Sequence, residues 1–248
     1  MRLVQRPNRY LVLFDLDGTL YRLRGGSYRR SPLRARVRAN ARRFLSERLD
    51  VSARRAAAML RAIERAYGEE ISIGVEPRFG IPRTEYFRTV WNIPAARMIR
   101  RPQDLRGTLS RVRRHVDIAV LSDAPSIWVN RVLRTLRIAD LFRGRIVSGE
   151  GDDRKSFGNA FRRLVVRYHL NPKRCIVVGD QERTDIIPAR AAGMRTIFVS
   201  ARTRSQRADV SIRSILDIEA ALARLTGVGV RGTTGASLYP SQPKRRRR

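Results

Sequence analysis

The stretch from Tyr10 to Tyr21, YLVLFDLDGTLY, decides the expected fold of this chain. It begins with five apolar residues and passes into a turn at Gly18, a pattern typical of a buried strand in a parallel sheet. Asp15 and Asp17 follow the apolar run, at the end of the strand where such sheets bind ligands. Two positions apart on extended chain, their side chains point the same way. The stretch therefore predicts a functional site.

Two converging carboxylates repel each other unless a cation joins them or one of them takes a proton. Magnesium is a hard cation that prefers oxygen ligands and needs no His or Cys. The two histidines, His115 and His169, stand apart from each other, and the single cysteine, Cys175, begins an apolar strand as a small buried residue. We therefore expect Mg²⁺ at this site.

Apolar strands and amphipathic helices alternate in the second half of the chain. Repeated strand–helix units predict an α/β fold with a doubly wound parallel sheet. The expected strands are 116–121, 145–148, 175–179 and 195–200, with 209–212 at an edge. The expected helices begin at residues 105 and 125 and span 156–169, 184–192 and 215–225.

A mostly helical insertion separates the first two strands. Its first helix follows Ser31-Pro32, Ser52 caps the second, and helical character returns at 85–91. We expect 68–82 to be looser, since it holds three glycines and two prolines. The predicted domains are a core of residues 1–21 and 102–225, a helical cap of residues 22–101, and a basic tail of residues 226–248. The tail lacks hydrophobic periodicity and is predicted to be disordered.

The charge of the chain is extreme. In 248 residues, 53 basic side chains oppose 22 acidic ones, for a formal net charge of +31. Such a field attracts phosphates and polyanions, which makes nonspecific association with nucleic acid through the Arg-rich cap and tail an open hypothesis. No apolar run is long enough to span a membrane, and one cysteine leaves no internal disulfide, so we expect a cytoplasmic protein without a membrane partner.

Four motifs occur in order along the chain: DLDGTLY from Asp15, a strand ending in Ser122, Lys155, and VVGD ending in Asp180, with Asp185 following. Together they resemble the motifs of the haloacid dehalogenase (HAD) superfamily, over roughly residues 10–225. The resemblance implies a HAD-like Rossmannoid core of capped subclass I, in which an insertion after the first strand closes over the site as a helical cap.

The resemblance also implies roles for the acidic residues. Asp15 would be the nucleophile that forms an aspartyl-phosphate, and Asp17 the general acid and then the general base. Asp15, the backbone carbonyl of Asp17, and Asp180 would bind Mg²⁺. Asp185 would support Asp180 from the second shell of the metal, although a first-turn carboxylate favoured by the helix dipole is the alternative reading.

The remaining motif residues are implied to bind the transferring phosphoryl group. Ser122 and Lys155 would contact it directly, and Asp123 belongs to the same binding loop. Asp123 stands where the family usually has Asn and adds a negative charge beside the phosphate. Outside this context Ser122 would be read as a helix cap and Lys155 as a surface residue, although Lys155 is one of only three lysines.

The carboxyl group of Asp17 favours a phosphatase over a dehalogenase within the superfamily. Dehalogenase members lack an acid two residues after the nucleophile, because a departing halide needs no proton. Finer likeness, in Tyr21 and in SDAPSIWVNRVLRTLRIADLF from Ser122, is to pyrimidine 5′-nucleotidases. The sequence therefore predicts a magnesium-dependent phosphatase of a small phosphorylated metabolite, with a nucleoside 5′-monophosphate as the leading substrate. The alternatives are a sugar phosphate or phosphoglycolate, or a basic nucleic-acid-binding protein on a HAD scaffold.

Overall fold

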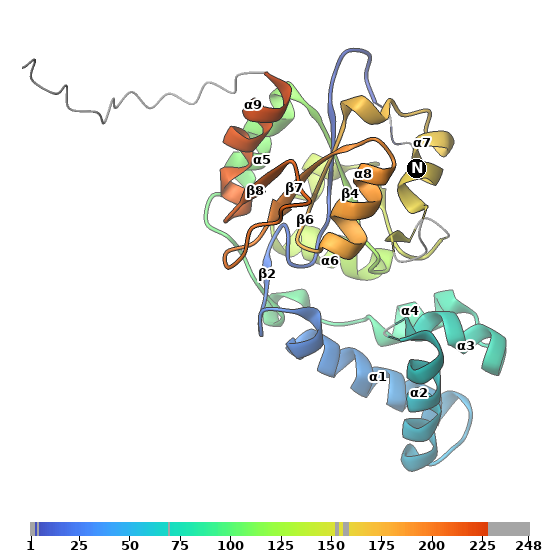
Figure 1. The fold of residues 1–248 in the computed structure, drawn as a ribbon. Helices are drawn as coiled ribbons and strands as arrows, with labels where there is room; N and C mark the ends of the chain where they lie inside the picture. Colours follow the sequence, from blue (N-terminus) through green and yellow to red (C-terminus); the bar gives the residue numbers. More distant parts are fainter. Residues whose placement is uncertain (1–2, 4, 69, 152–153, 156–158, 228–248) are drawn as a thin grey trace, which may run out of the picture.

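A six-stranded parallel sheet forms the centre of the computed structural model (Figure 1). The structure describes residues 3, 5–68, 70–151, 154–155 and 159–227. The strand order is β5-β4-β1-β6-β7-β8, which puts β1 in the interior between β4 and β6. The strands are β1 (Leu11–Phe14), β4 (Asp117–Leu121), β5 (Ile146–Val147), β6 (Cys175–Gly179), β7 (Arg195–Val199) and β8 (Val210–Ile212).

Helices cover both faces of this sheet, because alternate residues of each strand enter two separate apolar cores. Val12 and Phe14 of β1 face one core, which contains the apolar sides of α5 (Leu105–His115), α6 (Ser126–Thr135) and α9 (Ile218–Thr226). Leu11 and Leu13 face the other, under α7 (Ala160–Arg167) and beside α8 (Ile187–Ala191). The predicted doubly wound parallel sheet is confirmed.

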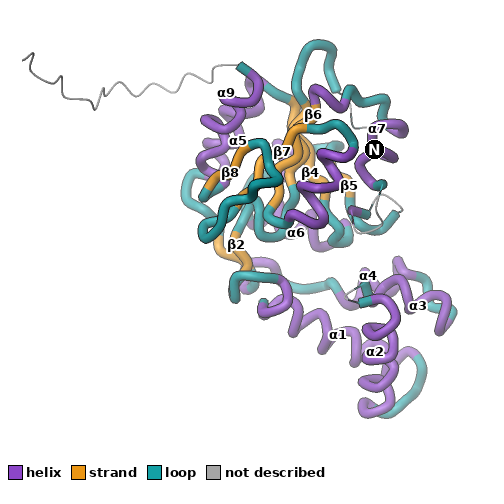
Figure 2. Tube along the Cα trace, in the orientation of Figure 1, coloured by secondary structure: helices purple, strands orange, loops and turns teal. Residues whose placement is uncertain are grey.

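The insertion forms a separate group of helices on one side of the core (Figures 1 and 2). We call α1 (Pro32–Arg48), α2 (Ala53–Tyr67), α3 (Ile71–Phe79) and α4 (Arg83–Val90) the helical lobe. Two linkers join it to the core, and they pair with each other as the antiparallel strands β2 (Arg22–Leu23) and β3 (Ile99–Arg100). Gly25 and Gly26 follow β2 with φ of 89° and 78°, so the first linker turns where only glycine is unstrained.

The expectation of a loose segment at 68–82 is wrong. Residues 71–79 form α3, with Pro77 inside the helix. Gly74 lies so close to α2 that an added Cβ would come within 2.7 Å of side-chain atoms of Ile63 and Tyr67. Packing against α2 therefore offsets the low helix propensity of these residues, as tertiary contacts often do.

Two helices of the core also differ from the prediction. The segment predicted as a helix from residue 184 begins with a π-helical turn at Glu182–Ile186. Pro188 has no backbone N–H and cannot bond the carbonyl of Thr184, which favours the wider turn. The helix predicted from residue 156 begins at Ala160, with 156–158 outside the described residues. The predicted disordered tail lies outside them from residue 228 on, and its first residue, Thr226, ends α9.

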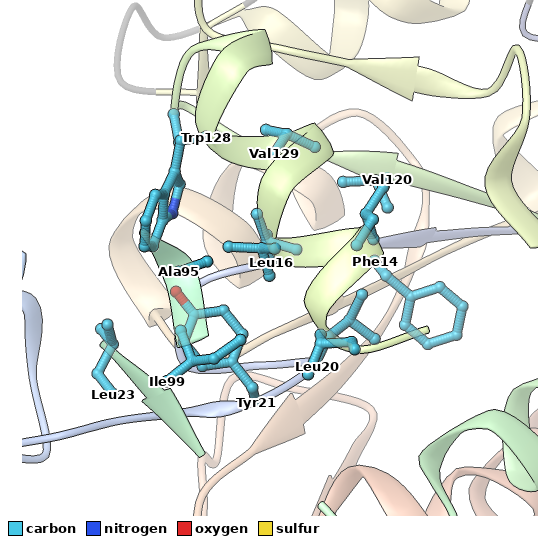
Figure 3. Close-up of a cluster of buried hydrophobic side chains, with 14 of the residues drawn as sticks. Phe14, Leu16, Leu20, Tyr21, Leu23, Ala95, Ile99, Val120, Trp128 and Val129 are labelled. Carbon is cyan, nitrogen blue, oxygen red and sulfur yellow. The ribbon is translucent and has the colours of Figure 1, made fainter. Parts of the chain in front are cut away.

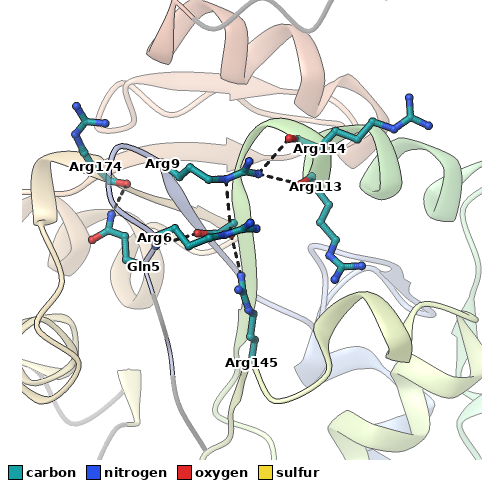
Figure 4. A network of polar contacts seen from close by, with 8 residues as sticks. Gln5, Arg6, Arg9, Arg113, Arg114, Arg145 and Arg174 are labelled. Carbon is teal, nitrogen blue, oxygen red and sulfur yellow. Dashed lines mark hydrogen bonds and ion pairs between the residues drawn. The ribbon is translucent and has the colours of Figure 1, made fainter.

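A buried carboxylate ties the N-terminal segment to the far end of the sheet (Figure 4). Asp117, fully buried, accepts hydrogen bonds from the Arg6 guanidinium at 2.7 and 2.9 Å. The guanidiniums of Arg145 and Arg9 lie 3.2 and 3.8 Å from the same oxygen. Burial opposes ionisation of Asp117, but the hydrogen bonds and positive charges of Arg6 and Arg145 lower its pKa below the usual value. We did not predict this network from the sequence.

Candidate active site

Asp15 lies at the carboxyl end of β1, where neighbouring strands hold it firmly. Its N–H donates to the carbonyl of Val178 in β6, at 2.9 Å. Its carboxylate is buried and both oxygens are engaged: the Thr19 hydroxyl donates to Oδ2 at 2.9 Å and Lys155 Nζ to Oδ1 at 2.6 Å. The orientation of this carboxylate is therefore set from two sides.

Lys155 connects two carboxylates at the centre of the site. Its Nζ donates to Asp185 Oδ1 at 2.6 Å as well as to Asp15, and only 4% of its side chain is exposed. Burial opposes the charge of the ammonium group, but the negative charges of Asp15, Asp185 and Asp123 outweigh it and raise the pKa of Lys155 well above its usual value. Lys155 is therefore a permanent cation in this site.

Three carboxylates meet beside Lys155 and form the candidate metal centre. Oxygens of Asp15, Asp180 and Asp185 lie within 4.8 Å of one another. Asp180 Oδ1 is buried and has no hydrogen-bond partner among the described residues. Burial, and then the charges of Asp15 and Asp185, raise the pKa of Asp180 to about 8. An all-oxygen donor set with an unpaired buried oxygen fits Mg²⁺ well.

Asp185 is part of this cluster, rather than an exposed carboxylate that only interacts with a helix dipole. It is fully buried, and its Oδ2 accepts from the N–H of Gln181 at 3.1 Å. Burial raises its pKa to about 6, although the Lys155 ammonium group opposes the increase. Asp185 lies within the π-helical turn Glu182–Ile186.

Two glycines make this convergence of side chains sterically feasible. Gly18 has φ of 104°, and a Cβ there would lie 2.2 Å from Asp180 Oδ2. A Cβ on Gly179 would lie 2.3 Å from Asp185 Cγ. Each glycine therefore leaves room for a carboxylate that comes from another part of the site.

The side chain of Asp17 is separate from this cluster. Its Oδ1 accepts two hydrogen bonds, one from the Tyr21 hydroxyl and one from Trp128 Nε1 at 2.9 Å. Both donors are buried among apolar side chains between β2 and α6 (Figure 3). Burial raises the pKa of Asp17 to about 6, and the two hydrogen bonds hold it from going higher. Trp128 also contacts Trp91 at the end of α4, with ring centroids 6.3 Å apart.

Ser122 and Asp123, which follow β4, make different contacts in the site. Ser122 is buried at the strand end, and its Oγ accepts from the N–H of Ala124 at 3.2 Å, as a turn-capping serine does. Its hydroxyl proton is therefore available to an acceptor in the site. Asp123 Oδ1 accepts from the backbone N–H of Lys155 at 2.6 Å. Asp123 thus orders the loop that carries Lys155, a contact that its predicted place beside the phosphate did not include.

The structure brings Asp15, Lys155, Asp180 and Asp185 into one buried cluster, and places Asp17 at its border. Sequence reasoning missed the donors that hold Asp17. Tyr21 belongs to the first motif, and Trp128 lies in the segment SDAPSIWVNRVLRTLRIADLF that begins at Ser122. The spacing of four residues between Asp17 and Tyr21 was the available signal for one contact. No local signal relates Asp17 to Trp128, 111 residues away.

The helical lobe contacts the core next to Lys155. Arg154, buried and adjacent in sequence to Lys155, forms an ion pair with Glu70, and its Nη1 lies 3.3 Å from Ser72 Oγ in α3. From the opposite direction, Arg83 Nη2 of α4 lies 3.4 Å from the carbonyl of Gly149 in the core. These contacts place the lobe beside the loop that positions the lysine.

The fold and site together define a parallel α/β protein with an acidic centre at the end of β1. The chain belongs to the haloacid dehalogenase-like hydrolase family, whose model matches residues 11–193. This confirms the superfamily predicted from the four motifs. No curated protein matches the chain in sequence. Among the described residues, none of the helices combines the length and the apolar character needed to cross a membrane.

Solved structures of this family show the same fold at low sequence identity. A HAD phosphatase from Thermococcus onnurineus is 19% identical, with 86% of this chain and 97% of that chain covered and a TM-score of 0.54. A 2-haloacid dehalogenase from Pseudomonas syringae is also 19% identical, with 87% and 99% covered and a TM-score of 0.56. A haloacid dehalogenase-like hydrolase from Xanthomonas campestris is 18% identical, with 91% and 96% covered and a TM-score of 0.57.

Proposed function

We propose that this protein is a magnesium-dependent phosphatase that hydrolyses a small phosphomonoester. The observation that carries the proposal is the carboxyl group of Asp17, two residues after Asp15 and held by Tyr21 and Trp128. A phosphate ester has an alkoxide leaving group that needs a proton, whereas a halide needs none. With its pKa raised to about 6, Asp17 is suited to give and take a proton near neutral pH.

The reaction divides into two steps on the residues described. In the first, an oxygen of Asp15 attacks phosphorus, the bond from phosphorus to the ester oxygen breaks, and Asp17 gives its proton to that oxygen. In the second, a water molecule attacks the phosphorus of the aspartyl-phosphate and Asp17 takes up its proton. Inorganic phosphate leaves and the Asp15 carboxylate is restored.

Lys155 and Ser122 bind the phosphoryl group in this scheme. The ammonium group touches Asp15 already, so a phosphoryl group transferred to Asp15 is within its reach. The Ser122 hydroxyl donates to a second phosphoryl oxygen. Phosphoryl transfer depends mostly on positioning and on neutralising charge, and these two groups supply both.

Asp15 and Asp180, with the backbone carbonyl of Asp17, would hold Mg²⁺, and Asp185 would support them. The ion supplies positive charge that offsets the repulsion between the carboxylates and the substrate phosphate. The putative HAD-hydrolase YfnB from Bacillus subtilis, 17% identical with a TM-score of 0.51, is described as bound to magnesium. That description supports the proposal through the shared fold.

The likeness to solved structures leaves the reaction open, since a phosphatase and a dehalogenase match at the same identity. Asp17 favours the phosphatase. For the substrate we propose a nucleoside 5′-monophosphate, on the resemblance to pyrimidine 5′-nucleotidases, with a sugar phosphate or phosphoglycolate as the alternative. The lobe contacts beside Lys155 support a small substrate that fits beneath a cap. From the sequence we also propose that the enzyme is cytoplasmic.

A panel of phosphomonoesters tests the proposal. Purified protein with Mg²⁺ is expected to release phosphate from one or more nucleoside monophosphates, sugar phosphates or phosphoglycolate. Asp15→Asn is expected to abolish release while circular dichroism shows an unchanged fold. Asp50→Asn, which removes an exposed carboxylate far from the site, is the matched control and should keep full activity. Metal-independent turnover, or turnover by folded Asp15→Asn protein, would refute the mechanism.

We also propose that the helical lobe associates with polyanions, as an addition to catalysis. Arg36, Arg42 and Arg43 are exposed along α1. Arg38, also in α1, forms an ion pair with Glu64 of α2, so part of the positive charge of this helix is neutralised within the lobe. Binding of RNA should fall steeply as salt rises. Replacing the three exposed arginines by Gln should weaken it without altering turnover of a small ester.

A further inference from the structure

A cavity of about 650 Å³ lies between the two linkers and the ends of β7 and β8, bordering the candidate metal centre. We call it the linker pocket. Five arginines line it: Arg22 and Arg100 of the linker strands, Arg101 beside them, Arg202 after β7 and Arg213 after β8. Its volume is in the range of ordinary small-molecule sites. Leu23, Phe198 and Ile215 contribute apolar walls.

The backbone places two of these arginines against each other. Arg22 and Arg100 are direct cross-strand partners in the β2–β3 pair. Like charges at directly opposed positions destabilise a strand pair. The Arg22 guanidinium also reaches across to the carbonyl of Arg213 at 3.4 Å, which brings the linker close to the end of β8. Positive charge is therefore concentrated here at an energetic cost.

The linker pocket differs from the other arginine cluster of the core in having no carboxylate to balance it. Arg6, Arg9 and Arg145 surround the buried Asp117 (Figure 4). Among the described residues, none of the five pocket arginines forms an ion pair. The one acidic residue in the lining is Asp180, and its carboxylate belongs to the candidate metal centre. Arginine is abundant throughout this chain, so the missing counter-charge is more informative than the number of arginines.

We propose that the linker pocket binds a small polyanion with two or more phosphate groups. A guanidinium binds phosphate oxygens in pairs, and arginine stays charged at any pH that the fold tolerates. Five guanidiniums from four separate segments exceed what one phosphate group can engage. A polyphosphate chain would satisfy them together and would relieve the repulsion between Arg22 and Arg100.

Binding at this position would act on the helical lobe. Arg22, Arg100 and Arg101 belong to the linkers, whereas Arg202 and Arg213 belong to the core. A polyanion that contacts both groups joins the linkers to the core and restricts movement of the lobe at the Gly25-Gly26 turn. This regulatory consequence rests on the proposed phosphatase function, since it concerns access to that site. The binding itself does not.

Calorimetry with inorganic tripolyphosphate, in magnesium-free buffer at moderate salt, tests the binding. Wild-type protein is expected to bind one tripolyphosphate more tightly than orthophosphate. Arg22→Gln/Arg100→Gln should weaken tripolyphosphate binding at least tenfold. Arg61→Gln/Arg65→Gln removes the same charge from the exposed side of α2 and should change it less than twofold. Equal weakening by both double variants would show attraction by net charge alone and would overturn the proposal.

Hydrogen exchange locates the ligand without relying on the variants. Tripolyphosphate should slow exchange in the linkers, at residues 22–26 and 99–103, and near Arg202 and Arg213. Protection confined to the segments around Asp15, Ser122 and Lys155 would place the anion in the catalytic site and overturn the proposal. If the linker variant fails to fold, Arg202→Gln/Arg213→Gln tests the same pocket from the core side. Both measurements are independent of turnover, so failure of the proposed phosphatase activity would be distinguishable from failure of this site.

Discussion

Replacing Asp180 by Asn is expected to stabilise the metal-free protein while abolishing its response to magnesium. Asp180 is held beside Asp15 and Asp185 with one buried oxygen unpaired, and its pKa is raised to about 8. In the unfolded chain the same carboxyl group has a pKa of about 3.9. Between these values the folded state holds a proton that the unfolded state has lost, so stability falls as pH rises through this window.

The magnitude follows from that difference. At pH 7 the unfolded carboxyl lies about three pH units above its pKa, and each unit corresponds to about 1.4 kcal/mol, so Asp180 costs the metal-free fold up to about 4 kcal/mol. Asn has the same shape, does not ionise, and can donate to the neighbouring carboxylates. The variant should therefore unfold at a temperature on the order of 10 °C higher.

Thermal or urea unfolding in EDTA, from pH 4 to pH 8, measures the effect. The advantage of Asp180→Asn over wild type should be near zero at about pH 4 and should grow as pH rises. Magnesium should then stabilise wild type, by about 2.7 kcal/mol at a hundred times its Kd, and leave the variant unchanged. Asp50→Asn, an exposed carboxylate at a residue with φ of 49° that Asn also tolerates, is the control for loss of charge alone.

Two results would refute this reasoning. If metal-free Asp180→Asn is less stable than wild type at pH 7, the carboxylate is not strained by its neighbours. If the advantage is the same at pH 5 and pH 8, it does not arise from ionisation of Asp180. Loss of turnover alone would not distinguish the metal site from other defects, which is why stability is the primary measurement.

Three further predictions concern other parts of the molecule. Trp128→Phe removes a hydrogen-bond donor to Asp17, so kcat for an alkyl phosphate should fall roughly tenfold or more. Hydrolysis of p-nitrophenyl phosphate, whose leaving group needs little protonation, should be almost normal. Equal losses with both substrates would contradict a positioning role for Trp128. Asp117→Asn should cost about 2–3 kcal/mol at pH 7, measured by urea unfolding. Because the pKa of Asp117 is lowered in the fold, this loss should begin to decline below about pH 4 and should vanish only when the pH falls below the folded-state pKa. Gly18→Ala should raise the Kd for Mg²⁺, measured from magnesium-dependent stabilisation, at least tenfold, because the added Cβ would lie 2.2 Å from Asp180 Oδ2. An unchanged Kd would show that the loop can move aside.

The amino-acid sequence alone was enough to predict the sheet and the position of the site. Continuous apolar runs at 10–14, 116–121 and 175–179 predict buried strands, and the resemblance to the HAD motifs implied that the acidic residues after the first and third of these runs share a site. Local patterns of this kind report on burial and on turns, which depend on neighbouring residues. Asp15, Asp180 and Asp185 were grouped through the motif resemblance, and the structure brings their oxygens within 4.8 Å of one another.

The tertiary structure decided the contacts that give these residues their chemistry. Only the fold brings Trp128 Nε1 to Asp17. Only the fold shows that the Asp123 carboxylate accepts a hydrogen bond from the Lys155 N–H, and its predicted contact with the substrate phosphate stays a prediction. Helix α3 forms because α2 packs on Gly74, against the local preference of the segment. The linker pocket and the Asp117 network likewise join segments that are far apart in the chain. A hydrogen bond or a cavity depends on distances between such segments, and local sequence patterns carry no information about those distances.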